Sequence, residues 1–206
     1  MIKNSTNLLL IFTRNPELGK CKTRLAATVG DQAALDIYNF LLQHTAKVTS
    51  QLSCDKAVYY SEEIWQDDVW DANTYEKKLQ EGSDLGEKMI NAFKEGFAAG
   101  YKNIIVIGSD LYDIHPEDLI HAFEQLAEHD FVVGPAEDGG YYLLGMNKLL
   151  PALFTNKKWG TDDVLQSTLQ DLQKETYFLL EEKNDVDYFE DIKDIPAFDP
   201  FIKHVK

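Results

Sequence analysis

Short apolar runs recur along the chain, and longer segments with an amphipathic pattern separate most of them. The runs predict strands, and those without polar alternation are typical of parallel strands that are buried on both faces. These runs cover residues 7–13, 56–61, 103–110, 130–135 and 141–147, and a weaker run covers 176–182. The run "NIIVIGSD" (103–110) is the strongest of them because it is apolar almost throughout.

The intervening segments predict helices. Apolar positions recur with helical spacing over 23–52, and Leu85, Met89 and Phe93 lie four apart in a segment that ends at Gly100, a residue that commonly terminates helices. Pro116 fits the first turn of a helix over 115–129. Thr161 is the expected cap of a helix over 161–174. The segment 62–82 has no clear period and is expected to be irregular with one short strand.

Strands that alternate with helices define an α/β protein. The order predicts a mainly parallel sheet with helices on both faces, in a single domain that spans residues 1–206. In such sheets ligands bind beyond the carboxyl ends of the strands. Polar clusters that directly follow apolar runs are therefore the first candidates for chemistry.

The composition limits the range of possible functions. The net charge of −15 argues against nucleic-acid binding, and no apolar run is long enough to span a bilayer, so neither nucleic acid nor membrane is an expected partner. Two cysteines are too few for a disulfide framework or a zinc cluster, and a cytoplasmic location with reduced thiols is expected.

The first cluster is "FTRNPELGKCKTRL" (12–25), which is basic in an acidic chain. It follows the first predicted strand and leads into a helix, where backbone N–H groups and cations such as Lys22 and Arg24 favour phosphate. The spacing matches neither a P-loop nor a dinucleotide fingerprint. A solvated basic turn that balances nearby acids is the alternative interpretation.

The second cluster is "GSDLYD" (108–113). Asp110 stands at the carboxyl end of the strongest strand, where a carboxylate can hold Mg²⁺ or Mn²⁺ together with water and phosphate oxygens. Asp113 fits better as a turn former or helix cap.

Two further clusters are weaker. In "GPAEDGGYYLLG" (134–145), Glu137 and Asp138 precede two glycines, and one of the two following tyrosines is expected to face the cleft; a plain hairpin is the alternative. In "DVDYFED" (185–191), Asp185 and Asp187 would project to the same side if the segment is extended, or would belong to a solvated acidic tail.

Taken together, these clusters, "GSDLGEKM" (83–90) and a tryptophan before the last long helix resemble a family of bacterial GT-A-type transferases. The family includes radical-SAM and selenodomain-associated transferases and a glycosyltransferase proposed to act in arsenosugar biosynthesis. The wider resemblance is to nucleotide-diphospho-sugar transferases, including guanylyltransferases. The match runs in order from about residue 8 to 195.

The resemblance implies a GT-A, Rossmann-like three-layer α/β/α sandwich with a mixed, mainly parallel sheet, and it implies a set of site residues. The nucleotide and phosphate side would comprise Arg14, Lys22, Thr23, Arg24, Asp84 and Gly86. Asp110 and Asp187 would bind the metal, and the acceptor side would comprise Glu137, Asp138, Gly139, Gly140 and Tyr141.

The sequence therefore predicts a metal-dependent transferase that uses a nucleotide or nucleotide-sugar donor and a small-molecule acceptor. Glycosyl transfer is the leading reaction, with Asp110 in a catalytic role and Glu137 or Asp138 as the base that deprotonates the acceptor. Nucleotidyl transfer on the same fold is one alternative. A nucleotide-sugar binding protein without catalytic activity is a second alternative. An unrelated flavodoxin-like protein is a third.

Overall fold

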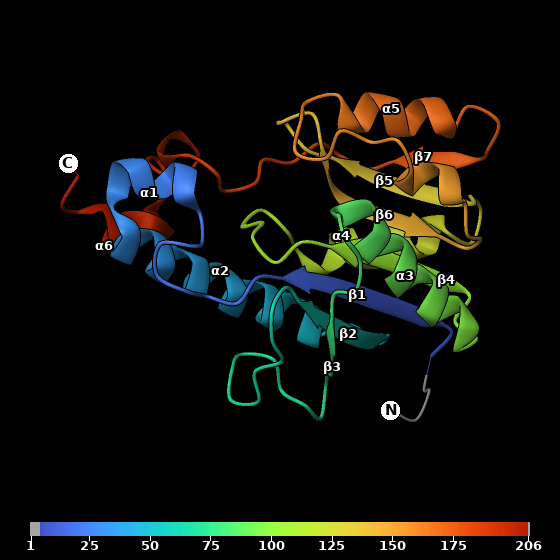
Figure 1. Cartoon of the computed structure of the whole chain (residues 1–206), viewed down its shortest axis with the longest axis horizontal. Helices are drawn as coiled ribbons and strands as arrows, with labels where there is room; N and C mark the ends of the chain where they lie inside the picture. The colour runs from blue at the N-terminus through green and yellow to red at the C-terminus, as the bar shows by residue number, and fades with distance from the viewer. Residues whose placement is uncertain (1–4, 206) are drawn as a thin grey trace.

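In the computed structural model, which describes residues 5–205, seven strands form one sheet in the order β3-β2-β1-β4-β6-β5-β7 (Figure 1). Residues 1–4 and Lys206, which the predicted domain of 1–206 includes, lie outside the described residues. The strands are β1 (Asn7–Thr13), β2 (Asp55–Tyr60), β3 (Glu76–Leu79), β4 (Asn103–Ile107), β5 (Phe131–Pro135), β6 (Tyr141–Met146) and β7 (Tyr177–Leu179).

The helices cover both faces of this sheet. They are α1 (Thr23–Val29), α2 (Asp31–Ser50), α3 (Leu85–Ala98), α4 (Pro116–Gln125), α5 (Val164–Asp171) and α6 (Asp199–Ile202), with short 3₁₀ turns at Pro151–Phe154, Phe189–Asp191 and Pro196–Phe198. Residues of α2 and α4 share one apolar cluster, and residues of α3 and α5 share another on the opposite face. The predicted three-layer α/β/α architecture is confirmed. Within residues 5–205, no helix is both long and apolar enough to cross a membrane.

The sheet is mixed, as predicted. β1 is an interior strand that pairs in parallel with β2 and with the central strand β4, whereas β6 runs antiparallel to both β4 and β5. Alternate residues of β1 enter the two apolar clusters, with Leu9 and Ile11 on one face and Leu8 and Leu10 on the other. The continuous apolar run therefore reflects burial on both faces of an interior strand.

The long helix predicted over 23–52 is wrong in one respect, because two helices occupy it. Gly30 separates α1 from α2 with φ of 83°, a left-handed conformation that a helix interior cannot contain and that glycine adopts readily. The apolar periodicity continues across this break, so the pattern concealed it. The predicted cap at Thr161 is also wrong: α5 begins after Asp163, and the Thr161 hydroxyl donates to the carbonyl of Lys158.

The C-terminal segment, which includes α6, returns across the molecule after β7 and packs against α1 and α2 (Figure 1). Phe198 is fully buried there, with its ring 5.4 Å from that of Phe40 and 4.9 Å from that of Tyr112. Val186 is buried in the same cluster. Because Asp187 is the next residue, this apolar packing fixes where that carboxylate lies.

Phe198→Ala should lower the free energy of unfolding by about 3–5 kcal/mol, because a large buried ring leaves a cavity between Phe40 and Tyr112. Leu179→Ala, at a side chain that is 42% exposed, is the matched control and should cost less than about 1 kcal/mol. Urea unfolding followed by circular dichroism measures both. Equal costs for the two variants would contradict the role of this cluster.

Candidate functional site

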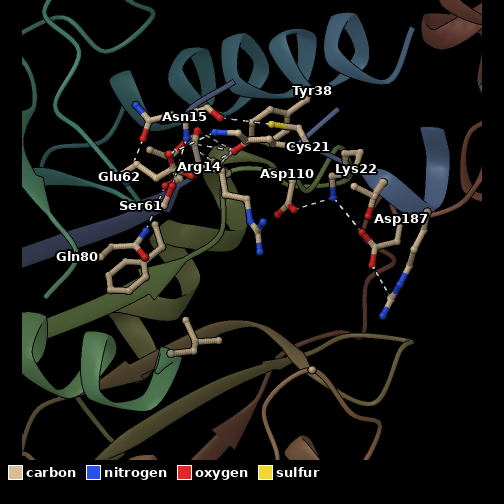
Figure 2. A pocket seen from close by; sticks show the side chains of 18 of the residues that line it. Arg14, Asn15, Cys21, Lys22, Tyr38, Ser61, Glu62, Gln80, Asp110 and Asp187 are labelled. Carbon is tan, nitrogen blue, oxygen red and sulfur yellow. Dashed lines mark hydrogen bonds and ion pairs between the residues drawn. The ribbon is translucent and has the colours of Figure 1, made fainter. Parts of the chain in front are cut away.

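A cavity of about 1070 Å³ opens at the carboxyl ends of β1 and β4 (Figure 2). Its wall is built from the loop after β1, the start of α1, the loop after β2, the start of α3 and the loop after β4. The lining residues are Phe12, Thr13, Arg14, Asn15, Lys20, Cys21, Lys22, Thr23, Arg24, Tyr38, Ser61, Glu62, Gln80, Leu85, Lys88, Ser109, Asp110, Asp138, Gly160 and Asp187. The position is the one that the sheet topology predicts for a ligand.

The basic loop after β1 is held in place by Asn15, which is 4% exposed. Its side-chain amide donates to the carbonyl of Glu63 at 2.8 Å, and its side-chain oxygen accepts from the backbone N–H groups of Glu62 and Glu63. The buried thiol of Cys21 donates to the carbonyl of Asn15 at 3.4 Å. These bonds join the loop after β1 to the loop after β2 and hold the basic loop against the cavity.

A buried hydroxyl network forms the floor between β1 and β4. The Ser109 hydroxyl donates to that of Thr13 at 3.1 Å and lies 3.3 Å from the Tyr38 hydroxyl. Tyr38 also accepts from the backbone N–H of Arg14 at 2.9 Å, and the hydroxyl of Thr45 donates to the carbonyl of Ser109. Helix α2 thereby fixes the two strand ends from which Arg14 and Asp110 extend.

Lys22 lies between two carboxylates at the centre of the site (Figure 2). Its Nζ is 2.7 Å from Asp110 Oδ2 and 3.1 Å from Asp187 Oδ1, and its side chain is 5% exposed. Burial alone lowers the pKa of Lys22, but the charges of Asp110 and Asp187 outweigh burial and raise the pKa above its ordinary value. Lys22 also has φ of 49°, an uncommon left-handed conformation for a residue other than glycine. The residue is thus held in a strained backbone position as a charged ammonium.

Asp110 extends from the loop that follows β4. Burial raises the pKa of Asp110, but the nearby charge of Lys22 outweighs this and lowers the pKa below the usual range. A Cβ at Gly108 would come within 2.9 Å of Asp110 Oδ1, so the glycine leaves room for the carboxylate. The glycine of the "GSD" motif is therefore required for steric reasons, in addition to the chemical role proposed for the aspartate.

Asp187 is oriented by a turn that Asp191 stabilises. The carboxylate of Asp191 accepts from the backbone N–H groups of Asp187 and Tyr188 at 2.9 and 2.6 Å. Arg24 donates to Asp187 Oδ2 at 3.1 Å and lies over the ring of Tyr188. Asp187 therefore contacts Lys22 and Arg24, two of the three cations predicted to bind phosphate.

Two cations of the cavity lack an acidic partner among residues 5–205. Arg14 extends into the cavity from the loop after β1, and Lys88 lines it from α3, and neither forms an ion pair with a described carboxylate (Figure 2 shows Arg14). Lys20, in contrast, pairs with Glu17 at 2.7 Å near the rim. In this structure Arg14 and Lys88 are the cations that can meet an incoming anion without first breaking an ion pair.

The predicted acceptor side is only partly at the cavity. Asp138 lines it, and its carboxylate accepts from the N–H of Gly140 at 2.8 Å, whereas Glu137 lies outside the lining. Gly139 has φ of 85°, and a Cβ there would come within 2.3 Å of the Asp162 carbonyl oxygen, so it is the point at which the loop before α5 packs. Tyr141 is half-buried near Met89, and neither it nor the following tyrosine lines the cavity.

Asp84 and Gly86, the predicted residues at the start of α3, stabilise the helix and its packing and do not line the cavity. Asp84 caps the helix by accepting from the N–H of Glu87 at 2.8 Å. Gly86 is buried, and a Cβ there would come within 2.4 Å of the Phe154 carbonyl oxygen and 2.8 Å of Trp159 Nε1. Their neighbours Leu85 and Lys88 line the cavity instead. Thr23, the first residue of α1, is exposed and lines the cavity as well.

The donor set fits a divalent metal in number and type. The carboxylates of Asp110 and Asp187 converge on one cationic position, which Lys22 Nζ takes, and Mg²⁺ commonly uses one or two carboxylates with water and phosphate oxygens. Within the described chain, no three Asp, Glu, His or Cys side chains gather into a complete metal site. Any divalent ion here would need ligands from water or from a bound anion.

Sequence reasoning missed several lining residues, among them Asn15, Tyr38, Gln80, Lys88 and Ser109. Ser109 precedes Asp110 in the motif, and Lys88 lies within "GSDLGEKM", so both could have been found from the motifs. Gln80 donates to the carbonyls of Thr13 and Tyr59 at 3.1 and 2.9 Å, which no local pattern indicates.

The fold matches solved structures of nucleotide-diphospho-sugar transferases and cytidylyltransferases. The protein is similar over 98% of both chains, with 29% identity and a TM-score of 0.87, to a presumed nucleotide-diphospho-sugar transferase from Desulfovibrio desulfuricans G20. The fold is shared with a 4-diphosphocytidyl-2C-methyl-D-erythritol synthase from Anaerococcus prevotii (9% identity, TM-score 0.58, covering 94% of this chain and 96% of that one). It is also shared with a CMP:2-keto-3-deoxy-manno-octonic acid synthetase solved with CTP (11% identity, TM-score 0.57, covering 94% and 98%).

The chain belongs to the family described as "Uncharacterized protein conserved in bacteria (DUF2064)", which matches residues 42–161. The matched part includes β2 to β6 and Asp110, and the basic loop and Asp187 lie outside it. No curated protein matches the sequence significantly.

Asp185 lies near the aspartates of the site. Burial, together with the charges of Asp138, Asp187 and Asp110, raises the pKa of Asp185 to about 6. A carboxyl whose folded-state pKa is raised binds its proton more tightly in the folded protein. Its contribution to stability is therefore most favourable below about pH 4 and is lost as the pH rises through 6.

Asp185→Asn should raise stability at pH 7 by about 1–2 kcal/mol, allowing for solvent screening, because it removes this unfavourable ionisation. The gain over the wild type should become small near pH 4, where the wild-type carboxyl is protonated in the folded state and about half protonated in the unfolded state. Melting temperatures of both proteins from pH 4 to 8 measure the difference. A gain that is the same at every pH would contradict the raised pKa.

Proposed function

We propose that the protein is a divalent-metal-dependent transferase that uses a nucleotide-sugar donor and transfers the glycosyl group to a small-molecule acceptor. The observation that carries this proposal is the arrangement of charged residues at the carboxyl ends of the strands. There, Arg14 and Lys88 face the cavity, and the carboxylates of Asp110 and Asp187 converge on a single cation position. Anion-binding and cation-binding groups side by side suit a metal-bridged diphosphate.

The cations that line the cavity are the residues proposed to bind the donor. Arg14, Lys88, Lys22 and Arg24 would contact the donor's phosphate oxygens and stabilise the charge that develops on the leaving diphosphate. A divalent ion held by Asp110 and Asp187 would neutralise the same charge as a Lewis acid.

Asp138 is the strongest candidate for the base that deprotonates the acceptor. It lines the cavity, and its bond from the Gly140 N–H fixes the direction of the carboxylate. Glu137, the other carboxylate considered from the sequence, lies outside the lining and is the weaker candidate. The Ser109, Thr13 and Tyr38 hydroxyls hold the floor rigid, which positions both substrates.

The similarity to a nucleotide-diphospho-sugar transferase along 98% of both chains supports glycosyl transfer as the leading reaction. The synthase and the synthetase share the fold at low identity, and the synthetase was solved with CTP, which supports nucleotidyl transfer as the second candidate. The released product separates the two reactions: glycosyl transfer releases a nucleoside diphosphate, and nucleotidyl transfer releases diphosphate.

A nucleotide screen tests the proposal. UDP, GDP, CTP, GTP and the matching nucleotide sugars, each with and without Mg²⁺ or Mn²⁺, should include at least one that raises the melting temperature by about 5–10 °C near saturation, because a ligand that binds only the folded state stabilises it by mass action. Asp110→Asn should remove the metal-dependent part of the shift. If no nucleotide shifts the melting temperature under any condition, the proposal is wrong.

Arg14→Gln should weaken binding of that nucleotide about tenfold, because it removes a charged donor that has no acidic partner within residues 5–205. Lys47→Gln, which removes the same charge from an exposed position of α2 outside the cavity lining, is the matched control and should leave the affinity unchanged. Isothermal titration calorimetry measures both variants. A loss of similar size in the two variants would indicate a general charge effect and would contradict the role of Arg14.

A further inference from the structure

The central ion pair of the site raises a question that the proposed function does not answer. Both carboxylates proposed to hold the metal are already neutralised by cations of the chain itself. Asp110 contacts Lys22, and Asp187 contacts Lys22 through one oxygen and Arg24 through the other. A metal ion that binds the oxygens in contact with these cations must displace at least one of the contacts.

Lys22 and a divalent ion that bridges the same two carboxylate oxygens exclude each other. The Lys22 ammonium lies 2.7 and 3.1 Å from one oxygen of each carboxylate, which is the space that a cation between them needs. A divalent ion bound to both oxygens would approach them to about 2.1 Å and would repel an ammonium at that distance. Because the Lys22 side chain is 5% exposed, solvent screens this repulsion little.

Lys22 can move only if its charge is accepted elsewhere. An ammonium that left both carboxylates without a new partner would remain as a buried, unpaired charge, which is strongly unfavourable. The backbone of Lys22 is fixed at the start of α1, but its four-carbon side chain is flexible and borders the cavity. An anion in the cavity, such as a phosphate group of the donor, would be the new partner.

We propose that Lys22 is a built-in counter-ion that competes with the divalent metal for the position between Asp110 and Asp187 and gives it up when a diphosphate enters the cavity. The inference rests on the proposed metal-dependent function and adds a linkage to it. The metal binds weakly to the protein alone and more tightly when an anion is bound, and by reciprocity the metal strengthens anion binding. Lys22 thereby neutralises the two carboxylates of the metal site when no donor is bound.

Binding of Mn²⁺ alone tests the competition, with the free ion measured by electron paramagnetic resonance. Lys22→Met keeps an unbranched side chain but leaves Asp110 and Asp187 without their shared cation, so it should bind Mn²⁺ at least about tenfold more tightly than the wild type. Arg24→Met is the matched control. It removes the same charge and also loses a contact to Asp187, but its side chain is 55% exposed and does not lie between the carboxylates. It should change the affinity by less than about threefold.

A second variant tests the competition if Lys22→Met fails to fold. Lys22→Gln removes the charge and retains a donor, so it should also bind Mn²⁺ more tightly than Arg24→Met does; circular dichroism and melting temperature confirm that each variant is folded. If neither Lys22 variant binds Mn²⁺ more tightly than Arg24→Met, the competition is refuted.

Adding the nucleotide that gives the largest shift in the screen separates this inference from the proposed function. Tight Mn²⁺ binding by the wild type with nucleotide, but no gain in either Lys22 variant without it, overturns the competition and leaves the transferase proposal standing. If the wild type and the Lys22 variants bind no Mn²⁺ under either condition, both proposals are wrong.

Discussion

The ion-paired group of Lys22, Asp110 and Asp187 is the interaction on which the site depends. Its three members come from the basic loop, the loop after the central strand β4 and the C-terminal segment, and the two aspartates lie 88 and 165 positions from Lys22 along the chain. A buried ammonium requires acidic partners, so each segment constrains the other two. The apolar cluster around Phe198 brings the C-terminal segment back to α1, and the sheet brings β4 beside β1.

This arrangement also accounts for the basic stretch in an acidic chain. The cations do not form a uniformly positive surface. Lys22 and Arg24 neutralise carboxylates that the same site contains, Lys20 pairs with a neighbouring acid, and Arg14 remains directed into the cavity. A site that holds both charges in balance can exchange partners when a metal and a diphosphate enter, because each incoming charge finds an opposite one already in place.

Much of the fold could be predicted from the sequence because its strands are buried on both faces. A short, continuously apolar run such as "NIIVI" is typical of such a strand, and alternation with amphipathic segments leaves few topologies. The break between α1 and α2 could not be predicted in this way. The apolar periodicity runs through Gly30, and only the positive φ at that residue shows that the chain turns.

The sequence by itself determined the sheet class, the position of the cavity at the carboxyl ends of the strands, and the residue types that line it, including Arg14, Lys22, Arg24 and Asp110. These follow from local patterns and from the geometry common to all parallel sheets. Only the tertiary structure decided how the charges pair: that Lys22 lies between Asp110 and Asp187, that Asn15 and Gln80 fix the loops, and that Tyr141 does not face the cavity. Pairing depends on distances between segments far apart in the chain, and packing of the whole molecule sets those distances.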